Sequence, residues 1–183
     1  MNLKPTRDFF YVAIIAILIA LCGQFYYSYQ YLPTRSEARV YYNRDIAVNK
    51  QIIQAIREAD KFVYFAVYTF TRDDIADALV AAKERGLEVK GVTDRKQVAE
   101  LDTQAAIIKK LQGVGIPIVT QDHSAIMHLK VLVTDNAYIS GSYNWTAAAT
   151  DKNDEVIEVG HDQKVRKEYE DVIKELLAKY NHQ

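Results

Sequence analysis

Cysteine is nearly absent from this chain of 183 residues, in which Cys22 is the only one. A single cysteine cannot form an intrachain disulfide, and it excludes a zinc site built from several cysteine ligands. An excess of positive charge is also lacking, because 23 Lys and Arg residues face 24 Asp and Glu residues, for a net charge of −1. A protein that holds nucleic acid across a wide basic surface should be more positive than this. Any recognition of phosphate must therefore be local, within a pocket.

One long apolar run stands near the N-terminus, at residues 9–22, behind Lys4 and Arg7. Its length suits the core of a signal peptide better than a membrane span of about 20 residues. The run can be extended through a tyrosine-rich flank, which would suit a membrane–water interface. We therefore expect residues 1–31 to form a hydrophobic helix that is either a cleaved signal peptide or an uncleaved membrane anchor. Export of the remaining chain, to the periplasm, the medium or the outer side of a membrane, is the favoured interpretation.

A polar stretch at 32–37, with Pro33, predicts a linker into a folded domain at 38–183. In that domain, strand-like and helix-like patterns alternate at first, and strands cluster later. Thr71 is expected to cap one of the helices, which should end at Gly86. The expected strands are 38–43, 61–70, 88–94, 116–120, 155–160 and a pair joined at Asp135 and Asn136. The expected helices are 46–60, 71–85, 103–115 and 163–180. This order predicts an α/β fold with a mixed sheet sandwiched between helices.

The strand pair carries an unusual set of polar side chains. His128 and Lys130 are two positions apart, so in a strand they project to the same face. Ser142 and Asn144 share a face in the same way if their strand continues that far. An antiparallel hairpin would then bring all four to one end of the sheet. The apolar side chains expected on the opposite face are Met127, Leu129, Val131 and Val133.

These groups suit a phosphate. A lysine supplies charge for the non-bridging oxygens, a serine and an asparagine supply directed donors, and His128 supplies a nucleophile or an acid–base group. Further along, Asn153 and Glu155 begin the next strand, and Glu155 could accept a hydrogen bond from the second ring nitrogen of His128. A histidine and a lysine in a strand are usually an ordinary core or surface pair. Lys130, however, lies in an otherwise apolar strand, where burial without an anion is costly.

The pattern His128-x-Lys130-x4-Asp135-x5-Gly141-Ser142-x-Asn144, followed by Asn153-x-Glu155, resembles the signature of the phospholipase D superfamily. The similarity extends over roughly residues 38–180. It is strongest to the short bacterial Nuc-type endonucleases, which carry one such motif per chain. The resemblance implies a mixed-sheet α/β fold and hydrolysis of phosphodiesters through a covalent phosphohistidine, with neither a metal nor another cofactor.

The resemblance also implies roles for individual residues. His128 would be the nucleophile or, in an opposing copy, the general acid, and Glu155 would orient the histidine. The implied catalytic residues are His128, Lys130, Asn144 and Glu155. The implied phosphate-binding residues are Lys130, Ser142 and Asn144. The residues given a structural role in the motif are Asp135, Gly141 and Asn153.

This chemistry needs two imidazoles, one to attack phosphorus and one to protonate the leaving oxygen. Of the other three histidines, none has a lysine two positions later, although His123 lies near enough in the chain to reach the rim of the site. The second imidazole must then come from a second copy of the chain. We expect a homodimer with one shared active site.

The sequence leaves the substrate open between classes. A nuclease acting on DNA or RNA fits the short architecture, and Arg95, Lys96, Lys109 and Lys110 could supply a local basic surface. A phospholipase D acting on phospholipid head groups fits an N-terminal segment held at a membrane. A non-catalytic phosphate-binding module is the third alternative, which the complete motif disfavours.

Overall fold

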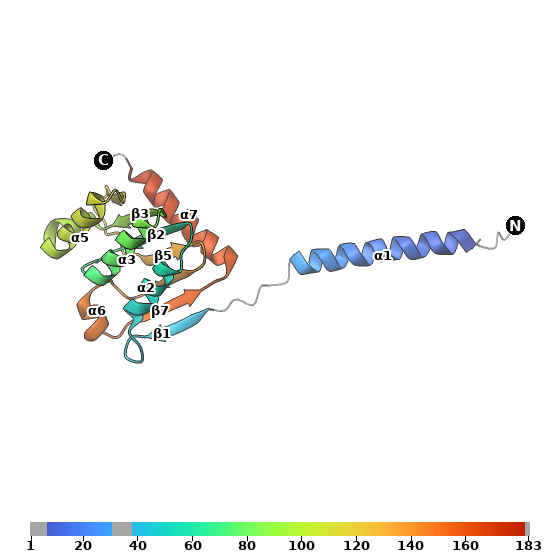
Figure 1. Cartoon of the computed structure of the whole chain (residues 1–183), viewed down its shortest axis with the longest axis horizontal. Helices are drawn as coiled ribbons and strands as arrows, with labels where there is room; N and C mark the ends of the chain where they lie inside the picture. The colour runs from blue at the N-terminus through green and yellow to red at the C-terminus, as the bar shows by residue number, and fades with distance from the viewer. Residues whose placement is uncertain (1–6, 31–37, 182–183) are drawn as a thin grey trace. The chain divides into compact units, whose positions relative to one another are not determined.

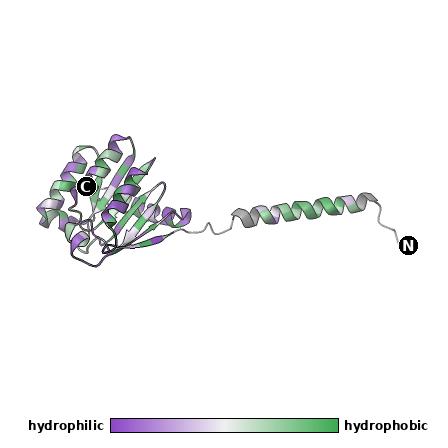
Figure 2. Ribbon diagram, turned by 60° about the horizontal axis from the view of Figure 1, so that its bottom comes forward, coloured by the Kyte–Doolittle hydropathy of each residue, from purple (hydrophilic) through white to green (hydrophobic). Residues whose placement is uncertain are grey.

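The computed structural model describes residues 7–30 and 38–181. The contacts divide the chain into two units, residues 1–35 and 36–183. The linker expected at 32–37 lies outside the described residues. The first unit contains α1 (Arg7–Gln30), whose ribbon is hydrophobic along most of its described length (Figure 2). Over the residues whose side chains the structure describes, no helix is both long enough and apolar enough to cross a membrane.

The second unit is built on a seven-stranded sheet (Figure 1). The strands run in the order β1-β7-β6-β5-β2-β3-β4. Neighbours β2, β3 and β4 are parallel, and all other neighbours are antiparallel. The strands are β1 (Arg39–Tyr42), β2 (Phe62–Val67), β3 (Glu88–Thr93), β4 (Ile118–Thr120), β5 (Lys130–Thr134), β6 (Tyr138–Gly141) and β7 (Val156–Gly160). The predicted mixed sheet is therefore confirmed.

Helices cover both faces of this sheet. On one face, α2 (Val48–Arg57), α3 (Asp73–Glu84) and α5 (Asp102–Gly113) pack against the strands, and α7 (Gln163–Lys179) lies on the other. Two short helices, α4 (Arg95–Glu100) and α6 (Ala147–Asp151), had no counterpart among the predicted elements. The expected layers, with a sheet sandwiched between helices, are confirmed.

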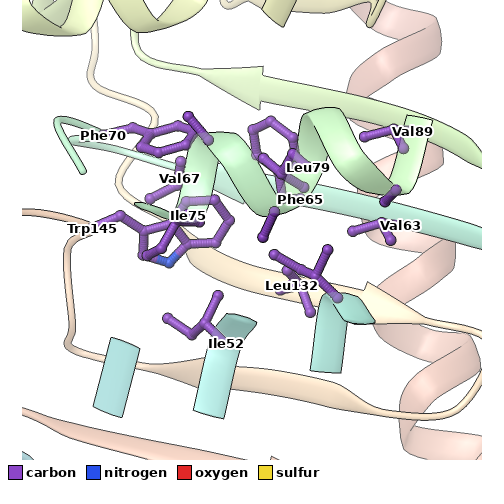
Figure 3. Packing of buried hydrophobic residues seen from close by; sticks show 14 of the residues in the cluster. Ile52, Val63, Phe65, Val67, Phe70, Ile75, Leu79, Val89, Leu132 and Trp145 are labelled. Atoms are coloured by element: carbon purple, nitrogen blue, oxygen red, sulfur yellow. The ribbon is translucent and has the colours of Figure 1, made fainter. Parts of the chain in front are cut away.

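The core follows the two-residue period of the central strands. In β2, Val63, Phe65 and Val67 join the cluster beneath α2 and α3, while Tyr64 and Ala66 join the cluster beneath α7. Figure 3 shows the first cluster, in which Phe65 and Phe70 lie against Trp145 with ring centroids 5.4 and 4.8 Å from the indole. Because Trp145 follows the polar motif directly, this packing anchors the motif to β2.

The expected cap at Thr71 is wrong. The backbone N–H groups of Thr71 and Arg72 both donate to the carbonyl of Trp145, at 2.8 and 3.1 Å, so both residues remain outside the helix. The N-cap residue is Arg72, whose side chain makes no capping bond, and α3 begins at Asp73. A tertiary contact has thus displaced the helix start that the local sequence favoured. The expected end of this helix is confirmed, since Gly86 has a φ of 89°.

Candidate active site

One edge of the sheet gathers the polar motif. The carboxyl end of β2 lies beside the beginning of β5, because Val67 pairs with Lys130 in an antiparallel ladder. The end of β6 reaches the same edge, since Val131 of β5 pairs with Ser140. β7 begins there as well, and Gly141 pairs with Ile157. The antiparallel hairpin predicted for β5 and β6 is confirmed, and it brings the two halves of the motif to one edge.

Tyr68, the residue after β2, connects the histidine and the lysine. Its ring lies edge-on to the His128 ring, with centroids 4.8 Å apart, and the Lys130 ammonium lies 5.2 Å from its centre. Lys130 also donates to the backbone carbonyl of His128 over 2.9 Å. Burial lowers the pKa of the Lys130 ammonium, and the Glu155 carboxylate counteracts part of this effect. The imidazole remains exposed, next to a half-buried cation.

The apolar face expected behind these residues is confirmed for three of its four members. Met127, Val131 and Val133 belong to the cluster beneath α7. Leu129 was wrongly placed there, because 36% of it is exposed. β5 begins only at Lys130, so the alternation of faces does not extend back to Leu129.

Glu155 is the buried acid of the site, with 8% of its surface exposed. The hydroxyl of Ser142 donates to one of its carboxylate oxygens, and Asn153 Nδ2 donates to the other over 3.1 Å. The Glu155 N–H donates to Asn43 Oδ1 over 3.0 Å. Among the described hydrogen bonds of this single chain, none joins Glu155 to the His128 ring, so the orienting role of Glu155 stays a prediction.

Asn144 lies beyond the end of β6, which stops at Gly141, so the strand does not continue as far as the same-face argument required. The residue is held in place by another route. Trp145 forms a parallel bridge with Phe70, and its N–H donates to the Thr69 carbonyl over 3.0 Å. The Thr69 N–H in turn approaches Asn144 Oδ1 at 3.4 Å. The amide oxygen therefore faces the backbone, which leaves the NH₂ group for a ligand oxygen.

Gly141 and Asp135 have separate structural surroundings. A Cβ at Gly141 would lie 2.2 Å from the Val156 carbonyl oxygen and 2.9 Å from Ile157 Cα, both backbone atoms, so only glycine fits there. Asp135 lies in the turn between β5 and β6, at the other end of β5 from Lys130. One of its carboxylate oxygens accepts from the N–H groups of Asp60 and Lys61, each over 3.1 Å.

Two residues absent from the predicted site contribute to it. The Tyr68 ring contacts both His128 and Lys130, and the Asn43 side chain accepts a hydrogen bond from the Glu155 N–H. Tyr68 was placed inside the expected strand 61–70, but β2 ends at Val67, so nothing in the local pattern marked Tyr68 as a residue at the strand end. Asn43 had no signal either, because it acts from the turn after β1, the edge strand beside β7.

The described residues contain no group of three His, Cys, Asp or Glu side chains that could hold a metal ion. A cavity of about 520 Å³ lies elsewhere, between α7 and the strands β2, β3 and β4, where Tyr64, Glu88 and Lys174 line it. No motif residue takes part in that cavity. The chemistry of the motif edge, with a cation, an amide and a hydroxyl near an exposed imidazole, suits an anionic oxygen ligand.

Fold and site together define an α/β protein whose motif residues gather at one sheet edge and suit an anionic ligand. Residues 52–177 match the protein family described as "Cardiolipin synthase, PLD-like domain". The chain belongs to this phospholipase D-like family, and the resemblance stated from the motif is confirmed.

Two curated relatives illustrate the range of the family. The chain is 29% identical over 138 residues to a "Mitochondrial cardiolipin hydrolase" of Xenopus tropicalis, which covers 75% of this chain and 64% of that protein. It is 29% identical over 145 residues to a "Phospholipase D" of Rickettsia prowazekii, which covers 79% of this chain and 69% of that protein. The chain thus spans about two thirds of the length of these relatives.

Two solved structures are similar over nearly their whole length. Nuc from Salmonella typhimurium, described as a phospholipase D family member, superposes with a TM-score of 0.74 at 28% identity. That match covers 80% of this chain and 97% of Nuc. NucT from Helicobacter pylori gives a TM-score of 0.70 at 23% identity, a likeness that shows the shared fold alone.

Proposed function

We propose that this protein is a phosphodiester hydrolase that cleaves nucleic acid without a metal, through a phosphohistidine formed on His128. The observation that carries the proposal is the arrangement at the motif edge. The exposed His128 ring and the Lys130 ammonium both contact Tyr68, and the pairing of β5, β6 and β7 brings the two halves of the motif to one sheet edge. A fixed cation, with Asn144 as an amide donor, can stabilise the charge that develops on a phosphoryl group.

The proposed reaction has two steps. In the first, a ring nitrogen of His128 attacks phosphorus, the bond from phosphorus to the leaving oxygen breaks, and a second imidazole protonates that oxygen. In the second, a water molecule attacks the phosphohistidine and gives a proton to the second imidazole, and the N–P bond breaks. Lys130 and Asn144 hold non-bridging oxygens throughout, with Ser142 assisting them.

The second imidazole is proposed to be His128 of another copy, in a homodimer with one shared site. The other two described histidines are engaged elsewhere. His123 Nε2 lies 3.1 Å from the Tyr180 hydroxyl, and His161 Nδ1 lies 2.9 Å from the Asn136 carbonyl in the β5–β6 turn. Ile126 and Leu129, on either side of His128, are 50% and 36% exposed. Such apolar side chains beside a reactive group support a face that a second copy covers.

Nucleic acid is the proposed substrate because the chain matches nearly all of Nuc, whereas it covers about two thirds of the relatives named for lipids. A phospholipase D that releases head groups and leaves phosphatidate is the second candidate. The names of those relatives favour it, as does an N-terminal segment that would hold the enzyme at a membrane if it is not cleaved. Export from the cytoplasm remains part of the proposal for either substrate.

One experiment separates these candidates. Purified protein is offered single-stranded DNA, duplex DNA, RNA and phospholipid vesicles, all in excess EDTA, with His128→Ala as the control. We expect cleavage of polynucleotide that EDTA does not reduce and that the variant lacks. Loss of activity in EDTA would contradict the metal-free mechanism, and turnover of lipid alone would establish the second candidate. No turnover of any substrate would leave a phosphate-binding module.

A further inference from the structure

A cavity with basic lining residues lies on the same edge of the sheet as the motif. It has a volume of about 320 Å³ and lies between the start of α4 and the loop from β4 to β5. Its ionisable lining residues are Arg95, Lys96 and His123, and none of the described residues that line it is acidic. Ser124 adds a hydroxyl group to the lining. The cavity therefore offers cationic and neutral donors, which suit an anion.

The position of this cavity relative to His128 follows from the sheet order. Arg95 comes just after β3, which is two strands from β5 in the order β5-β2-β3-β4. Adjacent strands are about 4.8 Å apart, so the two strand ends are about 10 Å apart. Phosphates along one strand of a DNA duplex repeat about every 3.4 Å of axial rise, so this separation is on the scale of near-neighbour phosphates of one strand. One polynucleotide could therefore reach both places.

Buried hydrogen bonds join the cavity to the motif. Asp94 is fully buried, and its carboxylate accepts from the backbone N–H groups of Gln97 and Met127, each over 2.9 Å. It also accepts from Gln121 Nε2 over 2.6 Å, while Gln121 Oε1 accepts from the Arg95 N–H over 2.9 Å. Met127 directly precedes His128. The same network thus fixes the start of α4, the loop and the approach to the histidine, so cavity and motif keep a constant separation.

The cations of the cavity are available to a ligand. Arg95 is exposed, and its Nη2 donates to the His123 carbonyl over 3.3 Å. Lys96 faces Glu100 at 3.7 Å in an exposed pair, which contributes little. By contrast, Lys110 is held by both Asp73 and Asp77, so this member of the predicted basic surface is neutralised.

We infer that Arg95 and Lys96, in this cavity, bind a second phosphate of a polynucleotide while His128 reacts at another phosphate of the same strand. This inference rests on the proposed nuclease function and gives it a physical basis in a chain without net positive charge. The cavity makes cleavage dependent on substrate length. A diester with a single phosphate can occupy the motif edge but gains nothing from the cavity.

The test compares the full chain with the double variant Arg95→Gln and Lys96→Gln. A matched control carries Lys50→Gln and Lys164→Gln, which remove the same charge from exposed positions on α2 and α7. The probes are bis-p-nitrophenyl phosphate, which has one phosphate, and single-stranded oligonucleotides of increasing length. We expect kcat/KM of the wild type to rise with length and that of the cavity variant to fall about tenfold on the longest oligonucleotide, through KM. The slope of log kcat/KM against log salt should become shallower by about 1 to 2.

The inference requires that the cavity variant keep wild-type activity on bis-p-nitrophenyl phosphate and that the control variant keep it on both probes. Equal losses on both probes, or equal losses in the two variants, would overturn the inference alone. So would an unchanged length dependence in the cavity variant. A wild-type protein that turns over phospholipid vesicles and no oligonucleotide would instead overturn the proposed nuclease function, and this inference with it.

Discussion

Lys130 combines a cost to stability with a proposed benefit to function. Its ammonium is partly withdrawn from water, which lowers its pKa, and the nearest hydrogen bond that the chain supplies is to the His128 carbonyl. A cation held in this way is ready for an anionic ligand because it has already lost part of its hydration. The same desolvation opposes folding.

Replacing Lys130 with Met should therefore separate activity from stability. We expect kcat/KM to fall by about 10²- to 10³-fold, as for loss of one preorganised donor. The free energy of unfolding should stay the same or rise. The folded-state pKa of Lys130 lies below the unfolded value, so its buried charge lowers the free energy of unfolding fully at neutral pH. Any stability that the variant gains should therefore vanish as the pH approaches about 10.4, where the lysine loses its charge in the unfolded chain as well. Urea denaturation across this pH range, with exposed Lys109→Met as the control, measures the effect. A lower unfolding midpoint would instead assign Lys130 a structural role.

The β5–β6 turn is held to the beginning of β2 by Asp135. Burial would raise the pKa of this carboxyl, but hydrogen bonds from the Lys61 and Asp60 N–H groups outweigh that effect and lower it. Since the turn lies at the opposite end of β5 from Lys130, Asp135 should stabilise the turn and take no part in the reaction.

Asp135→Ala should accordingly destabilise the protein by about 1–2 kcal/mol at pH 7 while kcat/KM per folded molecule stays within a few-fold of wild type. A carboxyl whose pKa is lowered in the folded state stabilises the protein above the unfolded pKa of about 3.9. This stabilisation is lost as the pH falls through the folded-state pKa. The difference between variant and wild type should thus shrink below about pH 4. Denaturation midpoints and initial rates test this, with exposed Asp122→Ala as the matched control. A large loss of rate in a fully folded variant would place Asp135 in the reaction.

At the scale of the whole molecule, one chain supplies only one of the two imidazoles that the proposed mechanism uses. His128 has no second imidazole opposite it among the described contacts of a single chain, since His123 and His161 bind Tyr180 and Asn136. The exposed apolar residues beside His128 support pairing with a second copy.

Mixing experiments test this pairing. When wild-type chains exchange subunits with a ninefold excess of His128→Ala chains, activity per wild-type chain should fall to about a tenth, because only wild-type homodimers carry two imidazoles. An equal excess of His161→Ala chains, altered away from the motif edge, should leave activity per chain unchanged. Constant activity per wild-type chain after complete exchange would mean that each chain works alone.

Much of this arrangement could be read from local patterns. The alternation of strand and helix and the hairpin at Asp135 and Asn136 follow from short-range periodicity, because side-chain direction in a strand repeats every two residues. Local rules were wrong where a distant contact intervened. Thr71 does not cap α3, because its N–H donates to the Trp145 carbonyl. Leu129 is exposed, because β5 begins only at Lys130. The short helices α4 and α6, of six and five residues, carry too few periodic positions to be recognised.

The motif residues could be picked out from the linear chain, because they rest on residue type and close spacing, and their proposed roles follow from the resemblance to the phospholipase D superfamily. The contacts around them could not be picked out in this way. The Thr69 N–H and Asn144 Oδ1 are 75 positions apart, and Asn43 meets Glu155 from 112 positions away. Such pairs form only after the strand order β1-β7-β6-β5-β2 is set by the packing of whole elements. That order also places Arg95 and His123 on the motif edge, since it brings separate strand ends to one side of the sheet.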